Sequence, residues 1–256
     1  MKDKLTVIKV GGGIIYDPII LDKFLVSFSK IKGYKLLVHG GGNITSNYLS
    51  RLGIQTEIVD GRRITNESTL DVAIMTYAGL INKTIVCKLQ KYKCNSIGLS
   101  GVDCNLIKAV KRPINKIDYG LVGDITEIND VFLNTLLKSK VTPVICSLSH
   151  DGNGQIFNTN ADTIASFLSI KLTKDFNVTL KYCFDKSGVL NDRNSLIKTI
   201  NLSNYKNLIN EKIISGGMIP KIENCFSALK QGVSNIFIGG NNVINNENYC
   251  TKLTLE

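Results

Sequence analysis

Apolar residues form short continuous runs along the chain, and the segments between these runs repeat apolar residues every three or four positions. Short runs are typical of buried strands, and the wider spacing is typical of helices with one buried face. The first run, residues 5–10, is followed by Asp17-Pro18, which has the N-cap and N1 chemistry of a helix start. Because strands and helices alternate in this way, the chain is expected to form βαβ units, and we predict an α/β fold with a mainly parallel sheet.

The same patterns predict elements over most of the chain. Strands are predicted at residues 5–10, 34–39, 95–99, 141–146, 178–183 and 235–238, an irregular hairpin at 106–110 and 120–126, and a final edge strand at 250–255. Helices are predicted at residues 17–32, 43–52, 67–92, 129–138, 160–172, 202–209 and 218–231, with a turn-rich segment at 147–156. No linker rich in Pro, Gly or Ser marks a boundary near 170–178, so we expect two lobes, 1–172 and 173–256, to share one sheet.

Composition and charge favour a soluble globular protein. The 256 residues are 43% hydrophobic and 20% charged, and the net charge is +10. The lysines are scattered, and aromatic residues do not interleave with the densest basic stretch, Lys108-Ala-Val-Lys111-Arg112. We therefore expect no nucleic-acid partner, since base recognition favours arginine and clustered charge.

Cysteines and hydropathy indicate a cytoplasmic protein. The seven cysteines include no Cys-x-x-Cys pair, and only two histidines are present, so a zinc site is not expected. The cysteines fit buried thiols in a reducing compartment. With neither a signal peptide nor an apolar run of about 20 residues, we expect no membrane partner.

Glycines beside lysines are the strongest chemical signal. Lys9 and Val10 precede Gly11-Gly12-Gly13, Val38-His39 precedes Gly40-Gly41-Gly42, and Lys221 closes the stretch that begins at Ser215-Gly216-Gly217. Glycine lets the backbone approach a ligand closely, and a strand that runs through glycines into a helix aims a positive helix end at an anion. This pattern predicts the transfer of a phosphate between two anions.

Eight stretches of the chain resemble the N-acetylglutamate kinases of the amino acid kinase family, in family order and over almost the whole length. They are Ile8-Lys9-Val10-Gly11-Gly12, Val38-His39-Gly40-Gly41-Gly42, Asp60-Gly61-Arg62-Arg63-Ile64-Thr65, Leu70-Asp71-Val72, Gly79-Leu80-Ile81-Asn82-Lys83, Gly98-Leu99-Ser100-Gly101, Asn158-Thr159-Asn160-Ala161-Asp162-Thr163 and Gly216-Gly217-Met218-Ile219-Pro220-Lys221. The resemblance implies a three-layer αβα sandwich. It also implies an N-terminal lobe that binds an acyl amino acid and dimerises, and a C-terminal lobe that binds ATP.

The resemblance implies ATP-dependent phosphorylation of the γ-carboxylate of N-acetyl-L-glutamate in arginine biosynthesis. A carboxylate is already an anionic nucleophile at pH 7, so positive charge and alignment matter more than a general base. Lys9 and Lys221 would supply that charge, helped by Mg²⁺ carried on the ATP phosphates. Asp162 would lie between the two lysines, although an aspartate early in a helix is often only a cap or a dipole-pairing charge.

The resemblance also assigns binding residues. Gly41 and Gly42 would direct N–H groups at the substrate, Arg63 would grip its α-carboxylate, and Asn158 would bind its α-carboxylate and acylamide end. For Asn158 an ordinary loop asparagine is the alternative. Arg62 would face solvent, unless the register of the two arginines is exchanged.

The ATP site would be formed by Gly11, Gly12, Asp185, Gly216 and Gly217. Asp185 could equally be a turn aspartate, and Gly216-Gly217 a plain helix boundary. The chain departs from the family pattern at Cys183-Phe184-Asp185, Cys104-Asn105 and Gly239-Gly240-Asn241.

Several alternatives share this scaffold or its motifs. The first is an N-succinyl-L-glutamate kinase, in which Lys111-Arg112 would serve a longer anionic acyl group; a solvated hairpin is the simpler interpretation of these residues. Aspartate, glutamate, carbamate and nucleoside-monophosphate kinases are more distant, and a catalytically silent regulatory subunit belongs to another class. Arginine-inhibited family members carry a helix before the first strand, and only four residues precede that strand here, so we expect a homodimer without arginine feedback.

Overall fold

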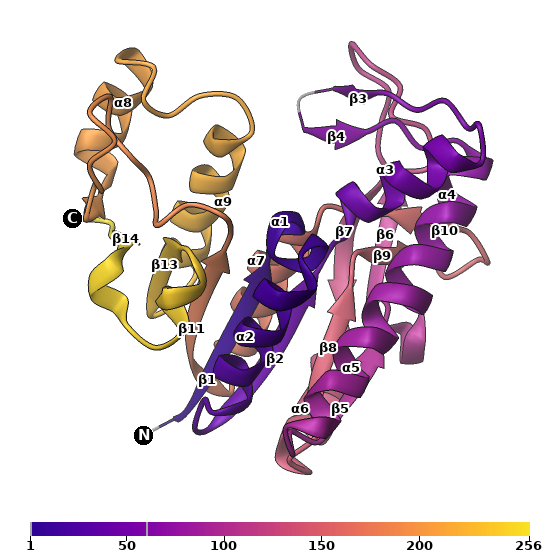
Figure 1. The fold of residues 1–256 in the computed structure, drawn as a ribbon, viewed down its shortest axis with the longest axis horizontal. Helices are drawn as coiled ribbons and strands as arrows, with labels where there is room; N and C mark the ends of the chain where they lie inside the picture. The colour runs from indigo at the N-terminus through magenta and orange to yellow at the C-terminus, as the bar shows by residue number, and fades with distance from the viewer. Residues whose placement is uncertain (1, 60) are drawn as a thin grey trace.

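A computed structural model of the protein describes residues 2–59 and 61–256. One large sheet forms its centre (Figure 1). Its strand order is β12 (Thr199–Ile200), β14 (Cys250–Leu253), β13 (Asn235–Gly239), β11 (Phe176–Cys183), β1 (Asp3–Val10), β2 (Tyr34–His39), β8 (Thr142–Cys146) and β5 (Ser96–Leu99). All neighbours are parallel except the antiparallel pair β13–β14. The predicted α/β fold with a mainly parallel sheet is confirmed.

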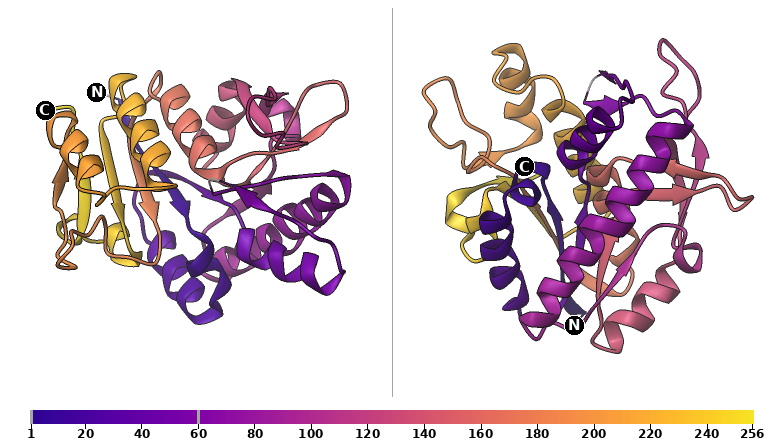
Figure 2. Two further views of the ribbon diagram at one scale, coloured as in Figure 1. Left: turned by 90° about the horizontal axis from the view of Figure 1, so that it is seen from above. Right: turned by 45° about the vertical axis from the view of Figure 1, so that its right-hand side comes forward.

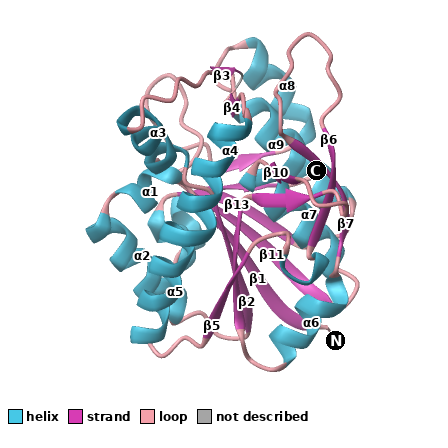
Figure 3. Cartoon of the chain, turned by 90° about the vertical axis from the view of Figure 1, so that its right-hand side faces the viewer, coloured by secondary structure: helices cyan, strands magenta, loops and turns pink. Residues whose placement is uncertain are grey.

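Helices cover both faces of this sheet (Figures 2 and 3). One face is covered by α1 (Gly12–Tyr16), α2 (Pro18–Ser29), α4 (Glu67–Ile74) and α5 (Asn82–Lys91), with α3 (Gly42–Arg51) beside α1 and α4. The other face is covered by α6 (Asp130–Lys138), α7 (Ala161–Leu172) and α9 (Met218–Lys230), with α8 (Leu202–Asn210) beside α9. The structure therefore has the three layers that the resemblance implied.

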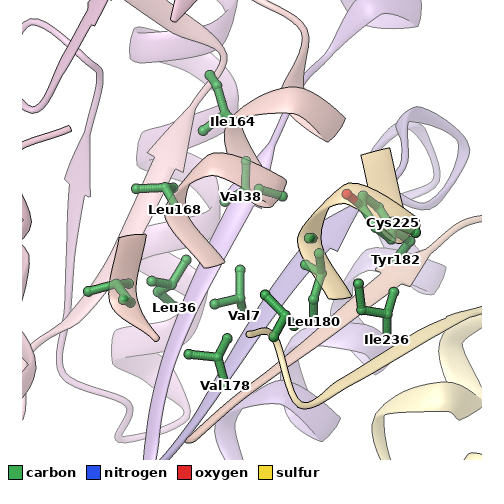
Figure 4. Packing of buried hydrophobic residues seen from close by; sticks show 14 of the residues in the cluster. Val7, Leu36, Val38, Ile164, Leu168, Val178, Leu180, Tyr182, Cys225 and Ile236 are labelled. Atoms are coloured by element: carbon green, nitrogen blue, oxygen red, sulfur yellow. The ribbon is translucent and has the colours of Figure 1, made fainter. Parts of the chain in front are cut away.

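Each strand of the centre divides its side chains between two cores. In β1, Leu5 and Val7 pack toward α7, whereas Ile8 and Val10 pack toward α2 and α5. Figure 4 shows the first of these cores, in which Val7 lies among residues of β2, β11 and α7. Lys9 follows Val7 by two positions and therefore projects from β1 on the α7 side.

Smaller sheets flank the centre. A four-stranded sheet has the order β10 (Ile156–Asn158), β9 (Leu148–His150), β6 (Ile107–Lys111) and β7 (Gly123–Ile128), and the short strands β3 (Ile58–Val59) and β4 (Arg62–Arg63) pair with each other. The predicted hairpin corresponds to β6–β7, which is antiparallel with an irregularity at Lys108/Ala109. The predicted turn-rich segment contains β9 and the start of β10, which the sequence patterns missed.

The prediction of an edge strand at the C-terminus was wrong. β14 pairs with β13 on one side and with the two-residue strand β12 on the other. β12 is too short to give an alternating pattern, so the sequence offered no sign of it. The predicted boundary between lobes 1–172 and 173–256 stays a prediction, while β11 pairs with β1 across it in one sheet.

The predicted long helix is continuous from Glu67 to Lys91 but changes its geometry in the middle. Residues Met75–Ile81 form a π-helical segment, η1, between α4 and α5. By length and composition alone this helix could cross a membrane, yet 44% of its most apolar window is buried inside the protein. Its inward residues, among them Leu70, Ile81 and Ile85, belong to the core, which is the packing of a core helix in a globular domain.

Candidate active site

A carboxylate held between two lysines forms the centre of the site. Asp162 Oδ1 lies 2.8 Å from Lys9 Nζ, and Asp162 Oδ2 lies 3.3 Å from Lys221 Nζ. The three side chains are only 14–17% exposed. Burial raises the pKa of Asp162, but the charges of Lys9 and Lys221 outweigh it and lower this pKa to about 2. The carboxylate is therefore ionised at neutral pH and lies between its two ammonium partners.

The start of α7 explains why the Asp162 side chain is free to reach both lysines. Asn160 is the N-cap: its Oδ1 accepts from the N–H groups of Asp162 and Thr163, at 2.8 and 3.1 Å. The structure thus gives the capping function to Asn160, a residue without an assigned function in the sequence analysis. The Asn-x-Asp pattern at a helix start is the signal that could have revealed it.

Two aromatic rings hold the second lysine. Lys221 Nζ lies 5.2 Å from the ring centre of Phe184 and 5.7 Å from that of Tyr182. The Tyr182 hydroxyl also donates to the backbone carbonyl of Asp162, at 3.1 Å. Neither ring was predicted to be part of the site, because a contact from β11 to α9 depends on how the two elements pack.

Two cavities meet at Asp162. The first, of about 200 Å³, is lined by residues of the glycine-rich turns, the arginines and the lysine end of β1, including Lys9, Gly12, Gly40, Gly41, Gly42, Arg62, Arg63, Arg112, Asn158 and Asp162. The second, of about 160 Å³, lies on the Lys221 side and is lined by Gly61, Arg62, Asn160, Asp162, Thr163, Gly217, Pro220, Lys221 and Asn224. Arg62 is half-buried and lines both cavities, so its predicted orientation toward solvent stays a prediction.

The first cavity holds a buried guanidinium among neutral partners. Arg63, 7% exposed, donates from Nη2 to Gly42 O at 3.1 Å and to Ser46 Oγ at 2.6 Å. Asn158 Nδ2 donates to Thr65 Oγ1 at 3.1 Å on another wall. Since a buried cation is stable only when it is compensated, this wall suits an anionic ligand.

The predicted glycines lie in three different situations. Gly12, Gly41 and Gly42 line the first cavity, and Gly217 lines the second. A Cβ atom at Gly41 would lie 2.2 Å from Ile81 Cδ1 and 3.0 Å from the Tyr77 ring, so η1 approaches this glycine closely. Gly216 is exposed in a left-handed conformation and lines neither cavity.

The predicted use of the Gly11 N–H for phosphate binding is not supported. This N–H donates to Cys183 O at 2.7 Å, because β1 and β11 stay paired to their ends. Asp185 is exposed outside both cavities, and its carboxylate lies directly over Gly13. Asp185 therefore lies beside the start of α1, and its predicted contact with the nucleotide stays a prediction.

Comparison with known proteins agrees with this geometry. The sequence model of the amino acid kinase family matches residues 4–240. The chain belongs to the amino acid kinase family. It is 50% identical over 241 residues to an acetylglutamate kinase of Phocaeicola vulgatus, covering 93% of this chain and 94% of that protein. It is 48% identical to an acetylglutamate kinase of Bacteroides fragilis, covering 93% and 92%.

Solved structures show the same fold. The crystal structure of smu.665 from Streptococcus mutans superposes with a TM-score of 0.81 at 25% identity, covering 98% of this chain and 99% of that one. The fold that the resemblance implied is therefore the fold of this family.

Proposed function

We propose that this protein is an ATP-dependent kinase that phosphorylates the γ-carboxylate of N-acetyl-L-glutamate; the relatives described above are named acetylglutamate kinases, which supports this proposal. The observation that carries the proposal is the Lys9–Asp162–Lys221 bridge at the junction of two cavities. One cavity would hold the acyl amino acid and the other the phosphates of the nucleotide. Each lysine then faces one of the two anions that must meet.

Transfer would proceed without a general base. A γ-carboxylate oxygen attacks the γ-phosphorus, the new O–P bond forms, and the bond from that phosphorus to the β–γ bridging oxygen breaks to release ADP. No proton moves, and the principal barrier is repulsion between anions. Lys9 and Lys221 would offset that repulsion, and Asp162 would keep their ammonium groups apart and aligned.

Arg63 and Asn158 would bind the remainder of the substrate. The Arg63 guanidinium lacks an acidic partner within the described chain, and its fork suits the α-carboxylate. Asn158, which lines the same cavity, would bind the acylamide. Gly41 and Gly42 lie at the start of α3, where helix N–H groups point outward with a positive dipole end.

The nucleotide would lie on the Lys221 side, with Gly216, Gly217 and Asp185 as the proposed contacts, and Gly12, which lines the first cavity, would contact the terminal phosphate where the two cavities meet. In residues 2–59 and 61–256 no group of three or more His, Cys, Asp or Glu side chains could hold a metal ion. We propose that Mg²⁺ enters on the ATP phosphates. We also propose a cytoplasmic homodimer; the absence of nucleic-acid and membrane partners stays a prediction.

One observation keeps N-succinyl-L-glutamate as a second candidate substrate. Arg112 lines the first cavity, and although it pairs with Asp124 through Nε and Nη2, its Nη1 is buried without a partner among the described residues. A second carboxylate on the acyl group could accept from that nitrogen. The relatives' names favour the acetyl group. The choice between the two substrates can be made by comparing kcat/KM for N-acetyl- and N-succinyl-L-glutamate.

The test is an ADP-release assay with hydroxylamine to trap the acyl phosphate. N-acetyl-L-glutamate should give ADP and a hydroxamate in equal amounts, whereas N-acetyl-L-glutamine, which lacks the γ-carboxylate, should give neither. A tenfold higher kcat/KM for N-succinyl-L-glutamate, about 1.4 kcal/mol, would transfer the proposal to that substrate. Absence of a hydroxamate with both acyl-glutamates would refute the kinase assignment.

A further inference from the structure

Three motif residues that the proposed reaction leaves without a function, His39, Asn82 and Gly98, meet in one buried network. His39 ends β2 just before the glycines, Asn82 begins α5, and Gly98 lies in β5. Asn82 Nδ2 lies 3.0 Å from His39 Nε2 and donates to Val144 O at 3.0 Å. His39 and Asn82 are both fully buried, and Gly98 provides the space, since a side chain there would lie 1.8 Å from Asn82 Oδ1.

The partners at both ends of the network fix the direction of every hydrogen bond. Lys83 Nζ can only donate, and it lies 3.3 Å from Asn82 Oδ1, so Nδ2 is the atom that faces Val144 O and His39. Since Nδ2 donates, His39 Nε2 must accept. The proton of the ring is therefore on Nδ1, which lies 2.8 Å from the carbonyl oxygen of Gly40.

Burial keeps this ring neutral. His39 is 0% exposed, and burial lowers its pKa to about 4, although the bond to Gly40 O acts to raise it. The ring therefore has a single donor, and Asn82 determines which nitrogen carries it.

The bond to Gly40 determines the orientation of the following peptide. In a trans peptide the C=O and the next N–H point in opposite directions. Gly40 O points toward His39 and Asn82, on the α5 side of the sheet, so the Gly41 N–H points toward the α7 side, where Lys9 and Asp162 lie. No described residue accepts a hydrogen bond from this N–H, and Gly41 lines the first cavity.

We infer that His39 is a positioning residue: held in its Nδ1–H form by Asn82, it turns the Gly40–Gly41 peptide so that the Gly41 N–H donates to the anion in the first cavity. The inference rests on the proposed kinase function. It also explains Asn82 and Gly98. Gly98 leaves space for Asn82, and Asn82 fixes the tautomer of the histidine that orients the Gly40–Gly41 peptide. His39 itself does not touch the substrate.

The first test compares two near-isosteric variants. The amide nitrogen of H39N can occupy the place of Nδ1 and still donate to Gly40 O, whereas that of H39Q reaches only the place of Nε2. We expect the kcat of H39N to stay within about fivefold of wild type and that of H39Q to fall roughly 10²-fold, the typical cost of one lost transition-state donor. The KM values for both substrates should change less than threefold.

Several results would overturn the inference. They are a kcat of H39Q within threefold of wild type, an equal loss in H39N and H39Q, or a loss expressed in KM alone. A wild-type protein without acyl-glutamate kinase activity would instead refute the proposed function, and the measurement below would still test the histidine.

The second test does not depend on any variant at position 39. The chain has two histidines, and His150 accepts at Nδ1 from the Gly152 N–H at 3.1 Å, which places its proton on Nε2. Nitrogen-15 spectra of histidine-labelled protein should therefore show opposite tautomers for the two rings, and H150N should remove the Nε2–H set. A remaining ring protonated on Nε2 would overturn the assignment of His39.

Discussion

At the scale of single residues, the site is an arrangement of buried charges that compensate one another. Two ammonium groups lie within 3.3 Å of one carboxylate, and a third cation, Arg63, is bonded only to neutral groups among the described residues. The charges of Lys9, Asp162 and Lys221 compensate one another without a ligand, whereas Arg63 needs an anionic ligand for compensation. This difference separates the residues expected to act on kcat from the residue expected to act on binding.

The lysines should affect the rate more than binding. K9M and K221M keep most of the length of the side chains but remove the charge where the transferred phosphoryl group is stabilised, so each kcat should fall about 10²–10³-fold. R63A should instead raise KM for the acyl-glutamate and leave KM for ATP nearly unchanged. Steady-state kinetics with each substrate varied tests both, and kcat values of both lysine variants within a few-fold of wild type would contradict the mechanism.

Asp162 should affect both the rate and the stability. D162N keeps the shape but leaves two buried ammonium groups without a counter-charge, so its kcat should fall roughly 10–10²-fold. Because the folded-state pKa is about 2 against an ordinary 3.8, the carboxylate contributes about 2 kcal/mol of unfolding free energy above pH 3.8, lost as pH falls through 2. Urea unfolding from pH 7 to pH 2 should show a shallower pH dependence for D162N, and equal slopes would exclude this contribution.

At the scale of elements, the β6–β7 hairpin and the segment that follows β4 are joined by one close contact. Gly120, just before β7, bridges to Thr65, and the Leu121 N–H donates to Thr65 O at 2.7 Å. Gly120 has φ +69°, and a side chain there would lie 2.3 Å from Thr65 O. This contact fixes the segment that follows Arg63, so it bears on substrate binding.

We therefore expect G120A to be both unstable and poor at binding. The left-handed backbone costs about 1 kcal/mol with alanine, and the clash with backbone adds more. The matched control is G53A, since Gly53 has φ +70° with open space around it and should show the first cost alone. The free energy of unfolding in urea should fall from wild type to G53A and further to G120A. KM for acyl-glutamate should rise only in G120A. Equal unfolding free energies of the two variants would show that the clash at position 120 is relieved.

The elements also show how far the sequence patterns could lead. Long periodic segments such as α2 and α7 were predicted because their apolar spacing is local information. β9, β10 and β12 have two or three residues and exist only through their pairing partners, and the five-residue α1 lies in a glycine-rich turn. Within the site, motifs identified Lys9, Asp162 and Lys221, whereas the rings around Lys221 and the occupied Gly11 N–H depend on how distant strands and helices pack.

At the scale of the whole molecule, an exposed apolar surface lies over α1, α2 and η1. A groove of about 220 Å³ between these elements is lined by Ile15, Tyr16, Pro18, Leu21, Ile44, Leu80, Ile81, Thr84 and Lys88. Tyr16, Ile19, Met75 and Leu80 are 46–68% exposed. Isolated apolar residues on a surface are common, but exposed apolar residues that line a groove, as Tyr16 and Leu80 do, are typical of an interface.

We predict that this surface joins two copies of the chain around a two-fold axis, the usual symmetry of homodimers. Light scattering should give a mass of about twice 28.1 kDa, and L80E, which places a charge in the groove wall, should shift the mass toward the monomer. The control is V131E, because Val131 is 72% exposed on α6, which covers the opposite face of the sheet. A monomeric or hexameric wild type would contradict this interface. Equal dissociation by L80E and V131E would also contradict it, because only an interface on the α2 side of the sheet should be disrupted by L80E and not by V131E.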